Sequence, residues 1–150
     1  ERIQQAKEHA LTPQQAITVA SIVDEETNKN DEKPKIASVY LNRLHKGIRL
    51  QADPTVKFAI GDFSIRRITG AHLQFSSPYN TYLNAGLPPG PICTPSIASI
   101  EAVLQAPATD YLYFCAKEDF SGYHRFAATL QEHMQNAHLY QQSLNERGIH

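Results

Sequence analysis

The sequence predicts an α+β domain that is mainly helical, with one short β-hairpin or small antiparallel sheet. Two observations predict this class. In several segments apolar residues recur every three or four positions, which is the period of a helix that buries one face. Near the C-terminus two aromatic and apolar segments, residues 111–116 and 123–127, flank the turn-forming residues 119–122, as is typical of a hairpin. Helices that surround a hairpin make an α+β domain.

Five segments have the pattern and the end signals of helices. The first follows Thr12 and starts with Pro13, a capping residue and a residue suited to the first helical position. The polar residues 28–34 then predict a loop. The helices are expected over residues 13–27, 35–46, 53–60, 96–105 and 129–147. In the last of them the residues expected to face inward are Met134, Ala137, Leu139, Tyr140 and Leu144.

Residues 61–95 are rich in Gly, Pro, Ser, Asn and Thr and predict an irregular stretch with at most one short helix. Loops of this length are usually functional or disordered. Because aromatic side chains gain much free energy by burial, the aromatic residues here favour order over disorder. They are Phe58, just before the stretch, and Phe63, Phe75, Tyr79 and Tyr82 within it.

Composition excludes several classes of protein. The 150 residues carry a formal net charge of −1, which argues against a general nucleic-acid binder, since such a protein is dominated by Lys and Arg. The longest strongly apolar run, residues 16–23, is far short of the roughly 20 residues of a membrane span. The His and Cys residues are scattered without a metal-binding spacing, so we expect no metal and no cofactor. Because the chain begins at Glu1, we expect any anchor or targeting segment to lie outside it.

An acidic run, Asp24-Glu25-Glu26, closes the first expected helix. On a helix Glu26 shares a side with the apolar Ile22 and Val23, whereas Glu25 projects from nearly the opposite side and Asp24 lies between them. A carboxyl group at an apolar margin loses water, which raises its pKa and lets it hold a proton near neutral pH. The spacing therefore indicates a general acid at Glu26. The alternative is an ordinary solvated helix end.

Two further clusters combine the side chains that suit a carbohydrate, because aromatic rings pack on sugar C–H faces while amides, hydroxyls and carboxylates bond sugar hydroxyls. In the first cluster, the alternative is that Asp53 only caps a helix. In the second, the alternative is that the tyrosines fill the core of an ordered loop. The candidate substrate-binding residues are Gln51, Asp53 and Thr55 in the first cluster and Tyr79, Asn80 and Tyr82 in the second.

Together these segments resemble the YceG-like family, the endolytic murein transglycosylases. Any one motif is weak, but the ordered set is specific and spans nearly all of the chain. The carboxylate that is essential in this family falls on Glu26, its earlier acid on Asp24, and Glu25 stands where the family has Lys. Cys93 and Ser96 also depart from the family pattern. The matching motifs are residues 21–27, 37–44, 50–56, 79–82, 86–92 and 111–114, with His124-Arg125-Phe126 and Glu132-His133.

The resemblance implies that residues 1–150 form a single YceG-like catalytic domain, with residues 1–10 as the end of a preceding linker or helix. The family's LysM-like domain and membrane anchor are not evident. The implied reaction cleaves the MurNAc–GlcNAc β-1,4 bond of peptidoglycan and leaves 1,6-anhydro-MurNAc ends, with one carboxyl group as acid and then base. The resemblance further implies termination of nascent glycan strands, partnership with peptidoglycan synthases, and a place on the periplasmic side of the inner membrane, where the full-length protein is anchored by a segment absent from this chain.

Three other functions remain open from the residues themselves. The chain could be a non-catalytic peptidoglycan-binding module, or a lysozyme-like hydrolase in which Glu26 works with a water molecule. It could also be a thiol peptidase built on Cys93 or Cys115 with His124, although a Cys in a predicted strand is more often buried and inert.

Overall fold

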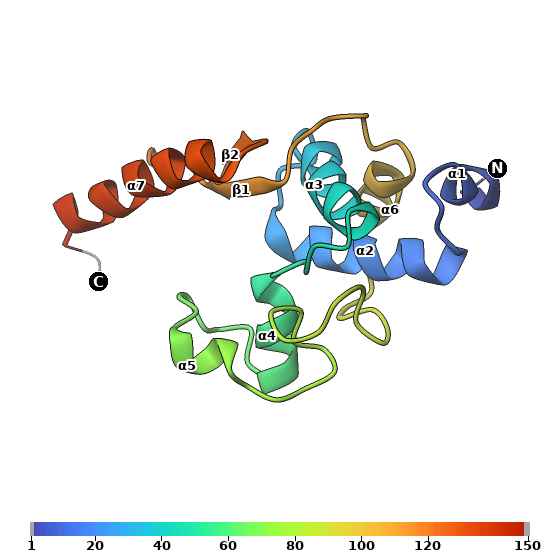
Figure 1. Ribbon diagram of the computed structural model, residues 1–150, viewed down its shortest axis with the longest axis horizontal. Helices are drawn as coiled ribbons and strands as arrows, with labels where there is room; N and C mark the ends of the chain where they lie inside the picture. The colour runs from blue at the N-terminus through green and yellow to red at the C-terminus, as the bar shows by residue number, and fades with distance from the viewer. Residues whose placement is uncertain (1, 149–150) are drawn as a thin grey trace.

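Three helices pack together to form the core of the computed structural model, which describes residues 2–148. Helix α2 (Pro13–Glu26) contacts both α3 (Lys33–His45) and α6 (Ile97–Leu104), and α3 and α6 also pack on each other. The short α1 (Arg2–Glu8) lies against the N-terminal part of α2 and against α6 (Figure 1). The side chains of Val19, Ile22, Val23, Ile36 and Val103 are almost completely buried where these helices meet.

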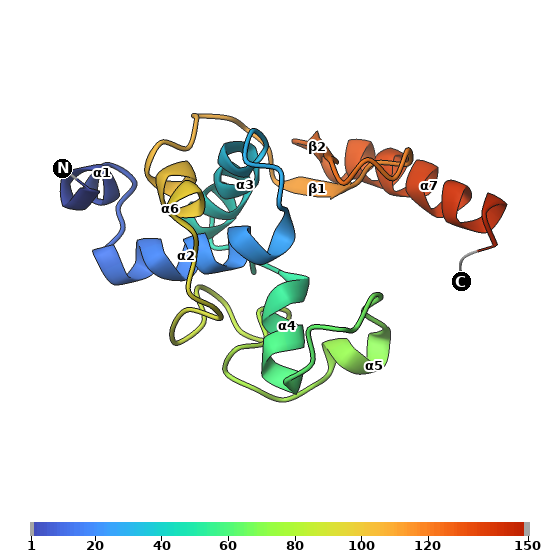
Figure 2. The same ribbon diagram turned by 180° about the vertical axis from the view of Figure 1, so that it is seen from behind.

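A lower lobe and a projecting hairpin are attached to this core (Figures 1 and 2). The lobe contains α4 (Asp53–Ile60) and the single-turn α5 (Gly70–Leu73). The strands β1 (Tyr113–Ala116) and β2 (His124–Ala127) pair antiparallel, with Phe114 opposite Phe126, and α7 (Leu130–Glu146) packs on both strands. This arrangement confirms the α+β class with one hairpin. Within residues 2–148, no helix combines the length and the hydropathy that crossing a membrane requires.

The start of α2 follows the sequence signals. The Thr12 hydroxyl accepts a hydrogen bond from the Gln15 amide at 3.1 Å, and the Gln15 side chain accepts one from the Thr12 amide at 2.9 Å. This reciprocal cap satisfies two backbone donors that a helix start otherwise leaves free. Helix α3 begins at Lys33, two residues earlier than expected, because Pro34 fits the first turn, where its missing N–H costs nothing.

The C-terminal helix differs from its prediction in which face is buried. Leu144 is only 6% exposed, but Met134 is 62% exposed and Leu139 is 41% exposed, so the expectation that they face inward was wrong. Helix α7 projects beyond the core and is covered on the side of the hairpin (Figure 1). A periodic apolar pattern therefore overstated how much protein lies against this helix.

Asp24 joins the end of α2 to the start of α6. Its Oδ1 atom accepts hydrogen bonds from the Ser99 hydroxyl at 2.6 Å and from the Ser96 hydroxyl at 2.8 Å, and the Lys33 ammonium lies 3.4 Å away. Partial burial opposes ionisation, but the hydrogen bonds from both serines outweigh it and lower the pKa of Asp24. The first acid of the run is therefore structural.

Replacing this carboxylate is expected to destabilise the protein. Asp24→Ala leaves the Ser96 and Ser99 groups without their acceptor and should lower the free energy of unfolding by about 1–3 kcal/mol. Because the pKa of Asp24 is depressed, the part of this difference that depends on ionisation is fully present at neutral pH and is lost as the pH falls through the folded-state pKa, below 3.8. Urea denaturation at pH 7 and pH 3 measures both effects. The exposed neighbour Glu25, changed to Ala, is the control, and equal stability of the two variants at pH 7 would contradict the assignment.

Candidate active site

Glu26 is the last residue of α2, and its side chain is only partly exposed. Its Oε1 atom accepts a hydrogen bond of 2.5 Å from the hydroxyl of Tyr40, which comes from α3 and is 2% exposed. The chain turns away immediately afterwards, because Thr27 is extended at the C-terminal cap. The carboxyl group is thus held between two core helices, on the apolar side of α2 that its spacing predicts.

The surroundings of Glu26 change its proton affinity. Burial raises its pKa from 4.5 to about 7, and the negative charge of Asp53 acts in the same direction. The Tyr40 hydrogen bond and the positive charge of Lys57 act against it. At neutral pH the group therefore exists in both forms, as a residue that first donates and later accepts a proton requires.

Asp53 lies at the start of α4 and faces the same region as Glu26. Its Oδ1 atom accepts a hydrogen bond of 2.5 Å from the Tyr82 hydroxyl. Burial and the charge of Asp53 both raise the pKa of Tyr82 well above its ordinary value, so the phenol stays protonated and keeps donating. The capping position of α4 is occupied by Ala52, so Asp53 does not serve as the simple helix cap that we considered as an alternative.

Two of the predicted glycan-binding residues are inaccessible. Thr55 is 0% exposed, and its hydroxyl lies 2.9 Å from that of Thr81. Asn80 is also 0% exposed, and its amide donates to the carbonyls of Leu73 and Phe75 at 3.0 and 2.8 Å. Both side chains are used to join loop segments to each other. Their direct contact with a ligand, which the motifs suggested, does not fit this structure.

Gln51 and Tyr79 have more open positions. Gln51 is exposed and has a φ of 50°, in the left-handed region. Its backbone N–H donates a hydrogen bond to the carbonyl of Thr81 at 3.3 Å. Tyr79 is half-buried and packs on Phe58, with ring centroids 4.8 Å apart. The interpretation that Tyr79 fills the core of an ordered loop is therefore correct in part, because the ring packs on Phe58 while some of the side chain stays exposed. Residues 61–95 are ordered around such contacts and contain the one short helix α5.

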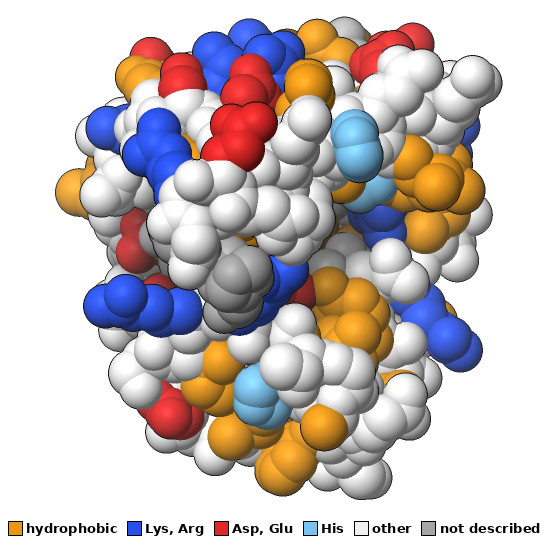
Figure 3. All heavy atoms as spheres, turned by 90° about the vertical axis from the view of Figure 1, so that its left-hand side faces the viewer, with side chains coloured by type: hydrophobic (Ala, Val, Ile, Leu, Met, Phe, Trp, Pro, Cys, Tyr) orange, Lys and Arg blue, Asp and Glu red, His pale blue; other side chains and the backbone are white. Residues whose placement is uncertain are grey.

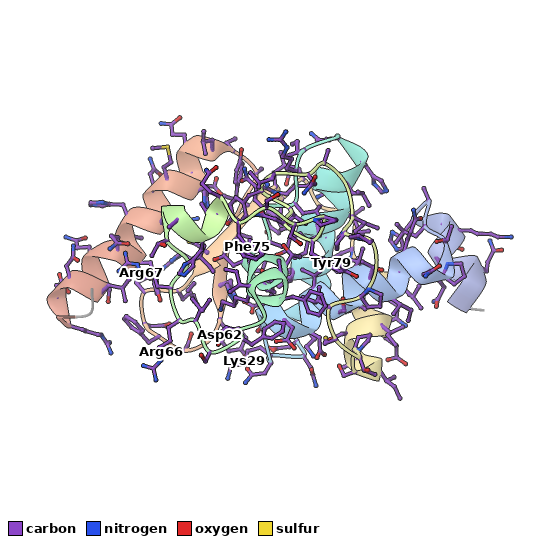
Figure 4. All side chains as sticks on the ribbon, turned by 90° about the horizontal axis from the view of Figure 1, so that it is seen from below. Lys29, Asp62, Arg66, Arg67, Phe75 and Tyr79 are labelled. Atoms are coloured by element: carbon purple, nitrogen blue, oxygen red, sulfur yellow. The ribbon has the colours of Figure 1, made fainter. Side chains whose placement is uncertain are left out.

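A hollow crosses the face of the molecule seen in Figure 3. Comparison with Figure 1 places the hairpin and α7 above the hollow and α4 and α5 below it. The C-terminal end of α2 points toward the same face, which is the left-hand side of Figure 1. Lys and Arg side chains lie along both edges of the hollow (Figure 3). Figure 4 shows Arg66 and Arg67 on the α7 side of the lower lobe, away from Tyr79. The Arg67 guanidinium reaches α7 and donates to the side-chain carbonyl of Gln141 at 2.9 Å.

A separate cavity of about 620 Å³ lies elsewhere. It is lined by the N-terminal half of α2, the end of α3 and the stiff residues 86–89. Thr18 is the member of its lining on α2 nearest to Glu26, and the two residues are more than two helical turns apart. The chemistry of the Glu26 region is therefore not inside this cavity.

Tyr40 is the site residue that sequence analysis missed. In the expected helix 35–46 its position is that of an ordinary apolar residue, and an aromatic residue there gives no hint of a functional role. A signal was present, because a buried Tyr hydroxyl usually finds a hydrogen-bond partner. The partner, Glu26, is 14 positions earlier on a different helix, and only the packing of α2 on α3 brings the two together.

The other candidate chemistries have poor geometry. Burial raises the pKa of Cys93 to about 11 and also raises that of Cys115, so both thiols stay protonated at neutral pH. The Nδ1 atom of His124 is 2.8 Å from Glu32 rather than free to act as a base for a thiol. Asp24, Glu25 and Cys93 bring possible metal-ligand atoms within 4.8 Å of one another, but Asp24 is already engaged by α6 and Cys93 is not a thiolate.

The fold agrees with what comparison with known proteins shows. The profile of the YceG-like family matches residues 1–139. The chain belongs to the YceG-like family, as the sequence motifs indicated.

Two named relatives and one solved structure illustrate the similarity. A Bacillus subtilis protein named endolytic murein transglycosylase is 43% identical over 94% of this chain and 38% of its own length. A Streptococcus pneumoniae protein of the same name is 35% identical over 73% of this chain and 21% of its own length. A crystal structure of a yceG-like protein from Listeria monocytogenes has a TM-score of 0.80 and 41% identity, covering 88% of this chain and 42% of that one. This chain thus spans about two fifths, or less, of the length of these relatives.

Removing the carboxyl group of Glu26 should stabilise the fold above neutral pH. The unfolded chain ionises this group near pH 4.5 and the folded chain near 7, so its ionisation costs stability increasingly as the pH rises through this range. Glu26→Gln should therefore be more stable than the unsubstituted chain at pH 8, by up to about 3 kcal/mol, with no difference near pH 4. Urea denaturation at both pH values tests this. Glu25→Gln, at an exposed position, should show no such pH dependence, and an unstabilised Glu26→Gln at pH 8 would refute the raised pKa.

Proposed function

We propose that this chain is the catalytic domain of an endolytic murein transglycosylase, which cleaves the MurNAc–GlcNAc β-1,4 bond within peptidoglycan strands. The names of its relatives support the substrate class. The observation that carries the proposal is the single carboxyl group of Glu26, whose pKa of about 7 lets it hold a proton at neutral pH. A lyase that forms an anhydro ring needs one such group, because no water has to be activated.

In the proposed reaction Glu26 acts twice. As an acid it donates its proton to the glycosidic oxygen while the bond from that oxygen to C1 of MurNAc breaks. As a base it then takes the proton of the MurNAc C6 hydroxyl, whose oxygen forms the new bond to C1. The products are a GlcNAc hydroxyl end and a 1,6-anhydro-MurNAc end, and Glu26 is protonated again. The hydrogen bond from Tyr40 holds the carboxyl group in place through both steps.

We assign the accessible side chains around Glu26 to substrate binding. Asp53 and Tyr82 form a hydrogen-bonded pair that can orient a sugar hydroxyl or acetamido group, and Gln51 and Tyr79 extend this surface. Thr55 and Asn80 support it from beneath, since their polar atoms join the loops that carry these residues. The glycan strand is proposed to lie in the hollow between the hairpin and the lower lobe (Figure 3).

The wider setting follows from the substrate. Peptidoglycan lies outside the cytoplasmic membrane, so we propose an extracytoplasmic location on the periplasmic side of the membrane, with anchoring by a part of the full-length protein outside these residues. Cleavage within strands would terminate nascent glycan chains, which makes the peptidoglycan synthases natural partners.

The direct test is the product of peptidoglycan digestion. The unsubstituted chain should release muropeptides with 1,6-anhydro-MurNAc ends, detected by mass spectrometry, and Glu26→Gln should reduce their yield at least about 100-fold. Glu25→Gln, one residue away and exposed, should retain full activity. Equal yields from the chain and from Glu26→Gln would remove Glu26 from the mechanism.

The same digestion separates the alternatives. Reducing ends in place of anhydro ends would identify a lysozyme-like hydrolase, in which a water molecule replaces the C6 hydroxyl. Undiminished binding to peptidoglycan after Glu26→Gln, with no product from either protein, would identify a binding module. Loss of activity on alkylation of Cys93 or Cys115 would point to thiol chemistry.

The pH dependence should report the protonation of Glu26. Because the acid step needs the protonated carboxyl group, kcat/KM should fall above about pH 7, where Glu26 ionises. Tyr40→Phe removes a hydrogen bond that favours the ionised form, so this alkaline limb should move to higher pH. Initial rates of anhydro-muropeptide release between pH 5 and 9 measure the alkaline limb in the unsubstituted chain and in Tyr40→Phe. A limb that stays in place, or moves downward, would contradict the role of the hydrogen bond.

A further inference from the structure

A buried carboxyl group that the proposed mechanism does not use lies close behind Glu26. Glu32, at the start of α3, is 4% exposed. Its Oε1 atom accepts a hydrogen bond of 2.5 Å from the backbone amide of His124, and its Oε2 atom lies 2.8 Å from Nδ1 of the same residue. A buried carboxyl group is costly unless it is bonded in this way, so the contact holds strand β2 against α3.

Glu32 also holds the residue that follows Glu26. The Thr27 hydroxyl donates to Oε2 of Glu32 at 3.1 Å and accepts a hydrogen bond from the Lys29 amide at 3.1 Å. Thr27 is 7% exposed and is the C-terminal cap of α2. The backbone that leaves Glu26 is therefore tied to Glu32 within one residue of the carboxyl group.

A second route leads from His124 to Glu26 through packed aromatic rings. The His124 ring meets Phe114 edge to face, with centroids 5.3 Å apart, and Phe114 meets Tyr40 in the same way at 5.7 Å. Tyr40 in turn donates to Glu26. Such perpendicular contacts have a preferred geometry, so a displaced His124 ring would loosen the packing of Phe114 on Tyr40.

The hairpin is attached to the loop after α2 at a third point. The Tyr123 hydroxyl lies 3.0 Å from Oδ2 of Asp31, and the Lys29 ammonium lies 5.3 Å above the Tyr123 ring. These groups are more exposed than Glu32 and His124, so they contribute less. Together with the Glu32–His124 bond, they join the loop 27–32 to the hairpin at two successive residues, Tyr123 and His124.

We propose that Glu32 and His124 are positioning residues for Glu26. Their contacts hold the end of α2 in place and keep the hairpin packed against Tyr40. The two residues touch neither the sugar nor the reacting atoms. Their effect is on the placement of the carboxyl group and on the exclusion of water from it, and small misplacements of a catalytic group are costly. This proposal rests on the proposed function of Glu26.

The test compares two substitutions of His124. His124→Leu removes the side-chain bond to Glu32, leaves the backbone bond in place, and should lower kcat about 10- to 100-fold with KM unchanged. His124→Asn can place its Nδ2 near the position of Nδ1 and should recover most of that loss. Arg125→Gln, the next residue on β2, breaks an ion pair with Glu118 and should leave kcat unchanged.

A second measurement separates positioning from general stability. The titration midpoint of the Glu26 carboxyl group, followed by carbon NMR, should fall below 7 in His124→Leu because water reaches the group. His124→Leu substitutes none of the other groups that act on this titration, Tyr40, Asp53, Lys57 and Tyr82. Loss of burial, which is the largest effect on the Glu26 pKa, outweighs any weakening of the Tyr40 hydrogen bond, so the midpoint moves downward. A merely structural role would reduce the amount of folded protein without moving the midpoint.

The outcomes are distinct. The proposal is overturned if kcat falls only in proportion to the folded fraction, if the Glu26 midpoint does not move, and if Asn is no better than Leu. If His124→Leu does not fold, Glu32→Gln is measured instead, since its side chain retains one acceptor. It should lower both the Glu26 midpoint and kcat, each by less than His124→Leu would. Absence of anhydro products from the unsubstituted chain would refute the proposed function, whereas the midpoint would still test the positioning of Glu26.

Discussion

The hydrogen bond from Tyr40 to Glu26, made where water is largely excluded, is the interaction on which the site depends. Burial favours the protonated carboxyl group, while the phenol favours the ionised one, and the balance leaves the pKa near neutrality. Because a low local dielectric strengthens both effects, a small change in packing would shift the balance. The site therefore needs a rigid junction between α2 and α3, which the core supplies.

The acidic run at the end of α2 shows how strongly the surroundings determine the role of a residue. Asp24 accepts hydrogen bonds from α6 and has a lowered pKa, Glu25 is exposed to solvent, and Glu26 is desolvated with a raised pKa. Of three successive carboxyl groups, the first is thus held by hydrogen bonds between helices, the second is in contact with solvent, and the third is desolvated and can carry a proton. The helical rotation of about 100° per residue separates them, because each position meets a different neighbour.

Several features were accessible from local pattern, and others were not. The caps of α2, the hairpin and the apolar side of Glu26 depend on short-range geometry, and the structure reproduces them. Thr55 and Asn80 were candidate substrate-binding residues, and their burial could not be predicted from a motif, since their partners lie on other loop segments. The prediction that Met134 and Leu139 face inward was wrong for a related reason, because periodicity shows that a face is apolar but not that another element covers it.

The sequence by itself determined the fold class and the family, because these follow from spacing and from motifs in a fixed order, and the same spacing predicted that Glu26 lies on the apolar side of its helix. Only the tertiary structure decided the partners of Glu26. Tyr40, Asp53 and Lys57 act on Glu26 from α3 and α4, and Glu32 and His124 meet from positions 92 residues apart. Local pattern carries no information about such pairs, since hydrogen bonds and desolvation depend on distance in space rather than on distance along the chain.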